Sequence, residues 1–525
     1  MALARTTLRR LARGARGGRW LSIVVVLLVS VVLRVWGIDF GLPYTYHPDE
    51  PAIVNRAVEM FRSGDLNPHW FHYPTLYTYL VAAAYYGLYL LGLWGRGWVA
   101  PGDMPAPQGL VMGGGMTEVP AQFLVARLVT MGLGILTVAL AYRVARQLWG
   151  REPGSLAALF VAVSSLHVGN AQFATTDVPM AFFVTLSLAF CVQVVRRGGW
   201  QDYALAGLAA GLAVSTKYNA GPILASLVVA HGLRAYPRLV DWRLLLGLSA
   251  SVLGFALGTP YAFLDVQTFW SDLVFELRHY ATGHHGSAGE RTWWWIVRVL
   301  VRQEALLLPL GVLGSAAGGL RRLDRGTLPL SVFILLYYAL LARQTVRFSR
   351  NLVVLMPALA VLGAGLVSLL ARWLHGKRWA VPLRMGWTVV IAGSLVIPLA
   401  RVVRRDRLLA QQDVRTTAGE WVTAHIDPES RIAGESYAPS LDPEVYDVEY
   451  LLRGAAHDPA WYREQGFEYL MLSSWMYGRY YREPERYAEQ VARYDSLFRA
   501  FSTAASFEGP MMGYPGAEIL ILRVR

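Results

Sequence analysis

Apolar stretches of about 18 residues or more recur along this sequence, and no other feature constrains its fold as strongly. An α-helix rises about 1.5 Å per residue, so a stretch of this length crosses the roughly 30 Å hydrocarbon core of a bilayer. Hydrophobic residues make up 54% of the 525-residue chain and charged residues only 16%, which excludes an ordinary soluble protein of this size. The stretches are also too many for a signal peptide followed by a soluble body, so the sequence predicts a multi-pass α-helical membrane protein.

About eleven stretches are predicted to cross the membrane. They cover approximately residues 20–37, 121–149, 153–170, 178–195, 202–217, 219–236, 243–262, 294–318, 327–343, 350–371 and 380–401. A further apolar segment, 74–94, is rich in tyrosine, which favours the membrane interface. If this segment does not cross, the basic turns, such as Arg143 to Arg151 and Arg234 to Arg243, all fall on the cytoplasmic side. We therefore expect 74–94 to lie in the outer interface.

The positive charge of the chain is explained by its topology. The formal net charge is +13, but most arginines lie at the ends of apolar segments, so nucleic acid is not expected as a partner. The basic cluster Arg5 to Arg19 precedes the first apolar segment and predicts a cytoplasmic N-terminus on an uncleaved helix. Cys191 is the single cysteine and lies in an apolar run, which leaves no disulfide framework or cysteine-based metal site.

The same topology predicts two domains. Residues 1–402 form the transmembrane domain, with a first outer loop, 38–120, that carries juxtamembrane helices, and a second large outer loop, 263–293. Residues 403–525 are more charged and predict a small α/β domain outside the membrane. Its expected helices are Asp413 to His425 and Pro459 to Gln465, and its expected strands are Arg431 to Gly434, Tyr469 to Leu472 and Glu518 to Val524.

Acidic residues open a short helix in the first outer loop. The segment Tyr46 to Pro51 contains Asp49 and Glu50 and precedes an amphipathic pattern, so a helix is expected to begin at one of these acids. The apolar face of this helix carries Ile53, Ala57, Met60 and Phe61. The N-terminal partial charge favours an ionised carboxylate, the form that a general base requires. Acids that merely complement the helix dipole are an equally good explanation.

Two more clusters are predicted on the same outer side. Asp177 precedes one span and Lys217 ends another, where a lysine breaks the positive-inside trend. A phosphate headgroup would explain this lysine, and simple snorkelling to the interface is the alternative. Arg347 and Arg350 lie in a basic turn between two later spans, and their planar forks suit phosphate oxygens.

A divalent metal site is a further possibility. The second outer loop contains His284 and His285 among several acidic residues, and His69 and His72 lie in the first loop. Imidazole and carboxylate groups are suitable ligands for a divalent ion. No pair shows a diagnostic ligand spacing in a defined helix, and a solvated loop is the favoured interpretation.

These motifs together resemble a known family. His-Pro-Asp-Glu follows the first span, Thr-Asp-x-Pro the third and Thr-Lys the fifth, and Arg-Phe-Ser-Arg precedes a late span that contains proline. This order resembles the GT-C glycosyltransferases related to protein O-mannosyltransferases and to the lipid A aminoarabinose transferase, those of glycosyltransferase family 39 type. The resemblance covers roughly residues 20–400 and implies a GT-C fold in the cytoplasmic membrane, with an active site on the extracytoplasmic side.

The resemblance also implies roles for residues. Asp49 matches the aspartate that deprotonates or orients the acceptor, Glu50 is its neighbour, and Asp177 resembles a second acid facing the same cavity. Lys217 resembles a lysine near the carrier phosphate, a role that the basic Arg347 and Arg350 would share. Tyr46 and His47, just before Asp49, complete the predicted substrate-binding and phosphate-binding residues.

The resemblance leaves the metal open. Where aminoarabinose transferases have a metal-ligating glutamate before Pro-Pro, this chain has His72 before Tyr73-Pro74. His72, with His284 and His285, could still hold a divalent ion. No cofactor is otherwise implied.

The predicted activity is an inverting sugar transfer from a polyprenyl-phosphate carrier to a protein, lipid or glycan acceptor beside membrane lipids. Cations would offset the charge on the leaving phosphate, and a carboxylate would act on the opposite face of the sugar. No dinucleotide-binding fingerprint is present, which fits a lipid-linked donor. A transporter or flippase is the main alternative, but it predicts inverted repeats and ionisable groups near the membrane midplane. An outer-face binding protein without activity would leave the acidic and basic clusters unexplained.

Overall fold

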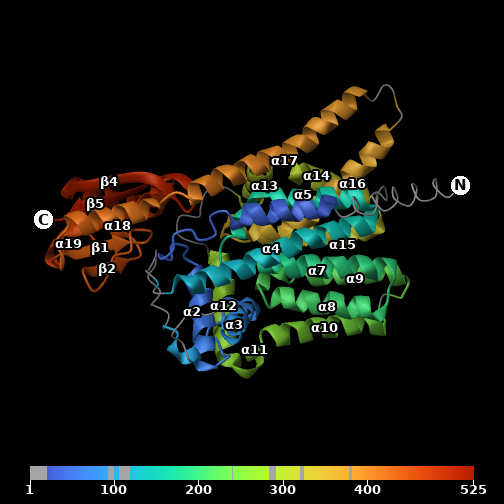
Figure 1. Ribbon diagram of the computed structural model, residues 1–525, viewed down its shortest axis with the longest axis horizontal. Coiled ribbons are helices and arrows are strands. Elements are labelled where there is room, and N and C mark those ends of the chain that lie inside the picture. Colours follow the sequence, from blue (N-terminus) through green and yellow to red (C-terminus); the bar gives the residue numbers. More distant parts are fainter. Residues whose placement is uncertain are drawn as a thin grey trace, which may run out of the picture.

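The computed structural model describes residues 21–92, 100–105, 117, 119–238, 240–282, 291–319, 324–375, 377 and 381–525. A body of helices carries a smaller domain with a β-sheet at one end (Figure 1). The predicted N-terminal basic cluster, Arg5 to Arg19, lies outside the described residues.

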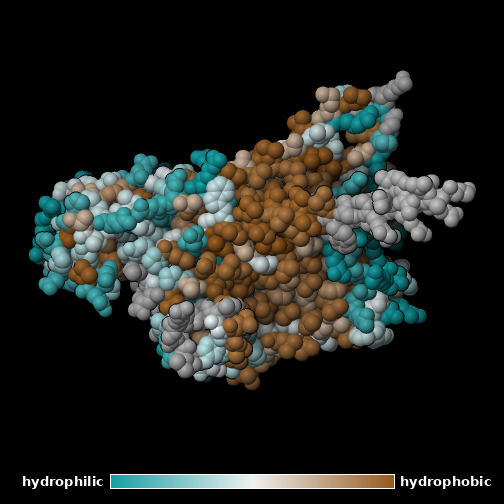
Figure 2. All heavy atoms as spheres, viewed as in Figure 1, coloured by the Kyte–Doolittle hydropathy of each residue, from teal (hydrophilic) through white to brown (hydrophobic). Residues whose placement is uncertain are grey.

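An apolar belt covers the face of the helical body that is seen in Figure 2. Figure 2 shows hydrophobic residues covering its middle, with hydrophilic residues at both ends. Large apolar side chains that face outward include Leu28, Val252, Leu257, Leu335 and Val389. Exposed apolar surface of this extent is typical of helices that face lipid. The chain is therefore a multi-pass membrane protein.

Every predicted span coincides with one or two helices. The described helices of this part, in order, are Leu21–Val35, α4 (Pro120–Trp149), α5 (Arg151–Val163), α6 (Ser165–Asn170), α7 (Asp177–Arg196), α8 (Trp200–Val214), α9 (Ile223–Ala235), α10 (Trp242–Gly258), α13 (Thr292–Glu304), α14 (Leu307–Gly319), α15 (Leu328–Ala342), α16 (Met356–Leu374) and α17 (Val381–Leu409). The predicted spans 153–170 and 294–318 are each broken into two helices.

Five stretches among the described residues are both long and apolar enough to cross a membrane. They are Pro120–Trp149, Asp177–Arg196, Arg325–Ala342, Ser349–Leu374 and Val381–His425, the last of which also includes the first helix of the C-terminal domain. Shorter apolar helices lie beside them, among them Leu21–Val35 and Trp242–Gly258. The predicted number of crossings stays a prediction.

Close helix contacts depend on small residues. α8 and α10 approach so closely that a Cβ atom on Gly207 would overlap the carbonyl oxygen of Gly247. Between helices in lipid, association relies on packing, and glycine permits the backbones to touch. The two helices also touch nearer the end of α8, where a Cβ atom on Gly211 would overlap the carbonyl oxygen of Ser251.

In its described residues, the segment predicted as the first outer loop, 38–120, contains two α-helices. α2 (Glu50–Ser63) begins directly after Asp49, with Pro51 in its first turn. Its predicted apolar face is buried against α3 (Leu76–Leu90). Figure 1 shows α3 nearly end-on, whereas α4, α7 and α8 run lengthwise through the view. This orientation fits a helix that lies across the direction of the spanning helices.

The segment predicted as the second large loop, 263–293, contains more structure than the sequence indicated. After the short α11 (Tyr261–Leu264), α12 (Val266–Thr282) runs for 17 residues. Asp272 and Glu276 are four residues apart, so both lie on one face of α12. Its other face exposes Trp270. The alternation of polar and apolar residues at helical spacing was the signal for this amphipathic helix.

The C-terminal domain is a five-stranded sheet with helices. The strand order is β2-β1-β3-β5-β4, with β1 parallel to β2 and β3, and β5 antiparallel to β3 and β4. The predicted elements are present as α18 (Val414–His425), β1 (Arg431–Glu435), α19 (Pro459–Glu464), β3 (Tyr469–Ser473) and β5 (Tyr514–Arg523). Elements that the sequence analysis did not identify are β2 (Asp447–Leu451), α20 (Ser474–Tyr481), α21 (Ala488–Ala500) and β4 (Ser502–Met511).

A buried carboxyl group ties this sheet to its surroundings. Glu435 ends β1 with no exposed surface, and it accepts hydrogen bonds from the backbone N–H groups of Gly454 and Ser473 and from the hydroxyl of Tyr494. Burial raises the pKa of Glu435 to about 7, although the three donors act in the opposite direction. The folded domain therefore holds a proton that the unfolded chain releases at lower pH.

The domain is expected to lose stability as the pH rises from about 4.5 to about 7. Because the folded-state pKa of Glu435 is raised, its contribution to the free energy of unfolding is complete below the unfolded-state pKa. This contribution declines as the pH rises to the folded-state pKa. The size is of the order of 2–3 kcal/mol. The melting temperature should be lower at pH 7 than at pH 5 in the wild type. This difference should disappear in Glu435→Gln and persist in the control Glu468→Gln, which changes an exposed residue. An equal fall in wild type and Glu435→Gln would contradict the prediction.

Candidate active site

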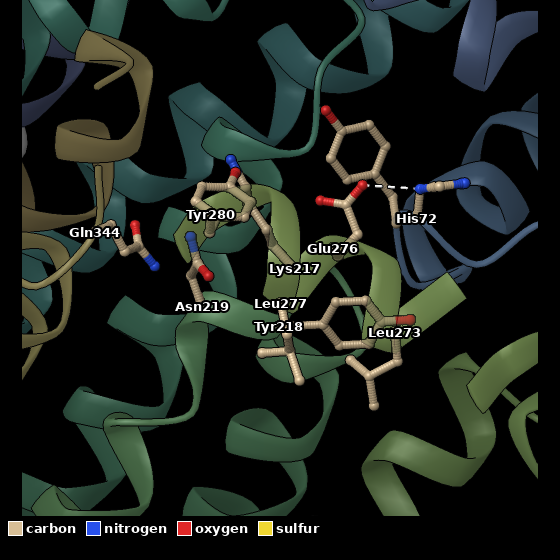
Figure 3. Close-up of a pocket in the computed structure, with 10 residues that line it drawn as sticks. His72, Lys217, Tyr218, Asn219, Leu273, Glu276, Leu277, Tyr280 and Gln344 are labelled. Carbon is tan, nitrogen blue, oxygen red and sulfur yellow. Dashed lines mark hydrogen bonds and ion pairs between the residues drawn. The ribbon is translucent and has the colours of Figure 1, made fainter. Parts of the chain in front are cut away.

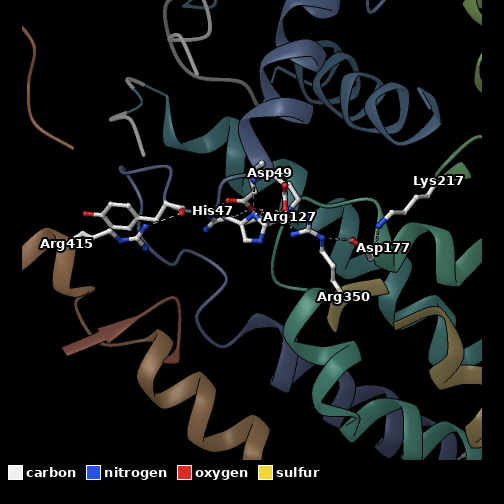
Figure 4. Close-up of polar contacts among 10 residues, drawn as sticks. His47, Asp49, Arg127, Asp177, Lys217, Arg350 and Arg415 are labelled. Carbon is white, nitrogen blue, oxygen red and sulfur yellow. Dashed lines mark hydrogen bonds and ion pairs between the residues drawn. The ribbon is translucent and has the colours of Figure 1, made fainter. Parts of the chain in front are cut away.

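Four separate segments bring their charged side chains together at one end of the helical body. Asp49 comes from the loop before α2, Asp177 is the first residue of α7, Lys217 follows α8, and Arg350 lies in the 3-10 helix η4 (Ser349–Leu355) before α16. Figure 4 shows Arg350 between Asp49 and Asp177, with Lys217 on the far side of Asp177. Four of the predicted site residues thus lie in one cluster, although they are up to 301 positions apart.

Lys217 and Asp177 form the buried half of the cluster. The Lys217 ammonium donates to Asp177 Oδ1 at 2.7 Å and to Asn351 Oδ1 at 2.8 Å. Lys217 is 4% exposed and Asp177 1% exposed. A charged pair in such surroundings is strongly coupled, because little water screens it. The lysine that broke the positive-inside trend is therefore held facing into the protein.

Arg350 links this pair to Asp49. Its Nη1 lies 2.6 Å from Asp49 Oδ2, and its Nε lies 3.9 Å from Asp177 Oδ2. The guanidinium also covers the Phe348 ring, at 4.3 Å from the ring centre. The side chains of Asp49 and Arg350 are 23% and 21% exposed, so a ligand can reach this half of the cluster. Arg347 lies half-buried in the same segment.

Glu50 points away from that accessible surface. Both its oxygens bind Arg127 of α4, at 2.8 and 2.7 Å, and Oε1 also accepts the N–H of Ala174. Arg127 donates further to the carbonyls of Ile38 and Phe40. Burial raises the pKa of Glu50, but the charge and hydrogen bonds of Arg127 outweigh it and lower the pKa overall. Glu50 is thus an ionised, fully enclosed anchor between α2, α4 and the loop before α7.

The two residues before Pro48 are also buried. His47 Nδ1 accepts the N–H of Asp49 at 3.2 Å, and its ring lies 4.5 Å from the Phe173 ring. Burial lowers the pKa of His47, which favours the neutral ring that this acceptor role requires. Tyr46 is 1% exposed and contacts the C-terminal domain. Both side chains shape the backbone that carries Asp49.

A small open pocket adjoins the cluster at Lys217. Figure 3 shows its polar side chains, with Lys217, Asn219 and Gln344 on one side and the Glu276–His72 pair on the other. Leu273, Leu277, Tyr73, Tyr218 and Tyr280 complete the lining. A largely apolar pocket with a few converging polar groups is the usual form of a small-molecule site. The sequence analysis did not assign Asn219, Tyr280 or Gln344 to the site.

The predicted metal ligands are only partly described. His72 Nδ1 lies 2.8 Å from Glu276 Oε1, and its Nε2 lies 3.9 Å from Asp272 Oδ1, so its two nitrogens address different carboxylates. His284 and His285 lie outside the described residues. In the part of the chain that the structure describes, no three His, Cys, Asp or Glu side chains are arranged to hold a metal ion. The metal hypothesis stays a prediction.

Sequence comparison identifies one family and one relative. Residues 113–257 match the sequence model of the family described as dolichyl-phosphate-mannose-protein mannosyltransferase. A protein of Aquifex aeolicus (strain VF5), described as uncharacterized, is 37% identical over 98 residues. That match covers 18% of this chain and spans 20% of the length of the relative.

Two solved structures are similar over most of this chain. ArnT from Cupriavidus metallidurans, bound to undecaprenyl phosphate, is 15% identical, with 97% of this chain and 98% of that chain covered and a TM-score of 0.50. The oligosaccharyltransferase AglB from Archaeoglobus fulgidus, in complex with an inhibitory peptide and a dolichol-phosphate, is 14% identical, with 91% and 71% covered and a TM-score of 0.52. At these identities the likeness shows a shared fold. The predicted resemblance to GT-C membrane glycosyltransferases is confirmed.

Proposed function

We propose that this protein is an inverting GT-C glycosyltransferase that moves a sugar from a polyprenyl-phosphate carrier to an acceptor on the outer face of the cytoplasmic membrane. The observation that carries the proposal is the cluster of Asp49, Arg350, Asp177 and Lys217 beside an open pocket. Both solved structures described above contain a polyprenyl phosphate, which supports a carrier of this class here. The transmembrane part, residues 1–402, forms the catalytic domain in this proposal, and 403–525 faces the same side.

Lys217 and Arg350 are suited to bind the carrier phosphate. Lys217 lines the pocket, and Arg350 lies on the accessible side of the same cluster. A developing phosphate charge is stabilised most by cations that are already in place and partly shielded from water. In this proposal Asp177 keeps the two cations in position, because its oxygens address both.

Asp49 is suited to act on the acceptor. It is the most accessible acid of the cluster and is held by Arg350 and by the first turn of α2. In one displacement, the acceptor forms a bond to the anomeric carbon and gives its proton to Asp49. The bond between that carbon and the phosphate oxygen breaks, and its electron pair leaves with the carrier phosphate. A single displacement inverts the anomeric centre. Glu50, which is enclosed by Arg127, has a supporting role in this proposal.

Lys217→Met is expected to abolish recognition of the carrier phosphate. A ligand that binds only the folded protein raises its melting temperature, so we expect undecaprenyl phosphate to raise the Tm of the wild type in detergent. The variant should lose that rise and lose transfer activity by about a hundredfold, since one preorganised donor is removed. Thermal unfolding with and without the lipid measures the first effect.

Two controls make this result specific. Lys377→Met removes the other lysine of the chain, which follows α16 and covers the ring of Trp373. This variant should keep the full Tm rise. Polyprenol, which has the chain but no phosphate, should give little rise with either protein. An equal response to polyprenol and to polyprenyl phosphate, or an unchanged response in Lys217→Met, would overturn the assignment of Lys217.

The sugar and the acceptor require a cellular experiment. Lipid and glycan profiles of a deletion strain, compared with its parent, should show one accumulated lipid-linked sugar and one glycan, lipid or protein that lacks it. Transfer by the purified protein between those two compounds then tests the proposed function directly. Labelling of single cysteines placed beside Asp49 and Lys217 from the outside of intact cells tests the proposed side of the membrane.

A further inference from the structure

The C-terminal domain contacts the segment that precedes Asp49. Arg415, in the first turn of α18, is fully buried, and its Nη1 donates to the carbonyl of Tyr46 at 3.3 Å. Its guanidinium carbon lies 3.8 Å from the centre of the Tyr46 ring, and the Tyr46 hydroxyl hydrogen-bonds to Thr416 at 2.8 Å. One tyrosine of the first outer loop is thus bound through its carbonyl, its ring and its hydroxyl.

Arg415 is itself fixed within the domain. Its Nε and Nη2 lie 2.8 and 2.9 Å from the two oxygens of Asp413. Asp413 also caps α18 by accepting the N–H of Arg415, and it accepts the N–H of Met512 between β4 and β5. A paired guanidinium with this many partners has one geometry. The position of Tyr46 is therefore set by the fold of the C-terminal domain.

A short path connects Tyr46 to the candidate base. His47 follows directly, its ring rests on Phe173, and its Nδ1 accepts the N–H of Asp49. Phe173 also lies beneath the guanidinium of Arg405, at 5.4 Å, near the end of α17. The backbone from Tyr46 to Asp49 is thus held on both sides by parts of the chain that lead into or belong to the C-terminal domain.

We infer that Arg415 is a positioning residue for the transfer reaction: through Tyr46, the C-terminal domain fixes where Asp49 stands. The inference rests on the proposed function of Asp49. It gives the C-terminal domain a role inside the reaction centre, and it requires no contact between that domain and the sugar.

Arg415→Met is expected to lower kcat by ten- to a hundredfold, because a small displacement of a reacting group has an effect of this size. The KM for the polyprenyl-phosphate donor should stay within about twofold, since Lys217 keeps both of its partners, Asp177 and Asn351. Arg415→Lys, which keeps the charge but not the two-pronged pairing, should recover part of the loss. A role in stability alone would not separate kcat from KM in this way.

A second variant and a control protect the test against misfolding. Tyr46→Leu leaves the Arg415–Asp413 pair intact and should reproduce the fall in kcat. Arg431→Met is the matched control. Arg431 also has acidic partners, Asp447 and Glu449, and lies over an aromatic ring, but all of these partners belong to the C-terminal domain. The control variant should keep the wild-type kcat. Wild-type kcat in both Arg415→Met and Tyr46→Leu, or a loss confined to donor KM, would overturn the inference.

Amide hydrogen exchange separates this inference from the proposed function. In the full-length protein, Arg415→Met should speed exchange across residues 44–50 and leave 54–61 of α2 unchanged. If exchange rises in this way but no variant, wild type included, transfers sugar, the proposed function fails and the structural coupling stands. If the wild type is active and exchange at 44–50 is unaffected, the positioning role is wrong.

Discussion

Asp49→Asn is expected to lower sugar transfer by about three orders of magnitude while the protein stays folded. General acid–base catalysis by a positioned group typically contributes between 10²- and 10⁴-fold, and an amide cannot accept the acceptor proton. Asn keeps the size of Asp and can still receive a hydrogen bond from Arg350, so the local structure should persist. Initial rates with the purified protein and a saturating lipid-linked donor measure the effect.

The matched control is Asp39→Asn, an exposed aspartate in the same outer loop, which should transfer at the wild-type rate. Asp177→Asn should also abolish transfer, but by weakening the hold on Lys217, and it should therefore reduce the Tm response to polyprenyl phosphate. Asp49→Asn should retain that response. A wild-type rate in Asp49→Asn would refute the role of Asp49 as general base. The absence of transfer by the wild type itself would favour a transporter, in which this carboxylate has no covalent step to assist.

Arg127→Met is expected to destabilise the protein by about 3–5 kcal/mol, the usual result of removing one partner of a buried ion pair. The substitution leaves the Glu50 carboxylate enclosed without its countercharge and removes the donor to the carbonyls of Ile38 and Phe40. Thermal unfolding in lipid nanodiscs should show a fall in Tm of roughly 3–5 °C. Because Glu50 directly follows Asp49, transfer activity should fall at temperatures below that transition as well.

The paired control is Arg62→Met, which breaks an exposed ion pair with Glu59 on the same outer loop and should change stability by less than about 1 kcal/mol. Combining Glu50→Gln with Arg127→Met should destabilise less than the sum of the two single changes, since the buried charge is then absent. Strictly additive effects, or an equal loss of stability in Arg127→Met and Arg62→Met, would show that the buried ion pair contributes no more to stability than the exposed one.

Sequence patterns predicted the elements well where local chemistry decides them. The apolar spans became helices, and α18 begins after Asp413 because that side chain caps it. β4 was not identified because Ser502–Met511 is poor in β-branched residues, and its strand state depends on pairing with β5. The sequence favoured a solvated loop for the acidic residues of α12. The structure shows instead that Glu276 lines the pocket and contacts His72, which lies more than 200 residues earlier in the chain.

The sequence predicted which residues belong to the site but not which of them contact one another. Position and charge indicated Asp49, Asp177, Lys217 and Arg350, which the structure brings together. Arg127 was missed, although an arginine inside an apolar segment is costly enough to demand a partner, and that rule could have found it. Its partner, Glu50, is 77 residues away, and only the three-dimensional fold joins them. Arg415 and Tyr46, 369 positions apart, were unpredictable for the same reason.

Arg350 forms an ion pair with Asp49, and Lys217 forms one with Asp177. In the proposed reaction this arrangement protects the carrier against wasteful hydrolysis. Water is always abundant at the outer surface, but a carboxylate already bound to a guanidinium is a weak base toward it. In this proposal the carrier phosphate shares the Arg350 guanidinium with Asp49, and the bound donor shields the anomeric carbon from solvent. The protein would thus be reactive only while its donor is in place.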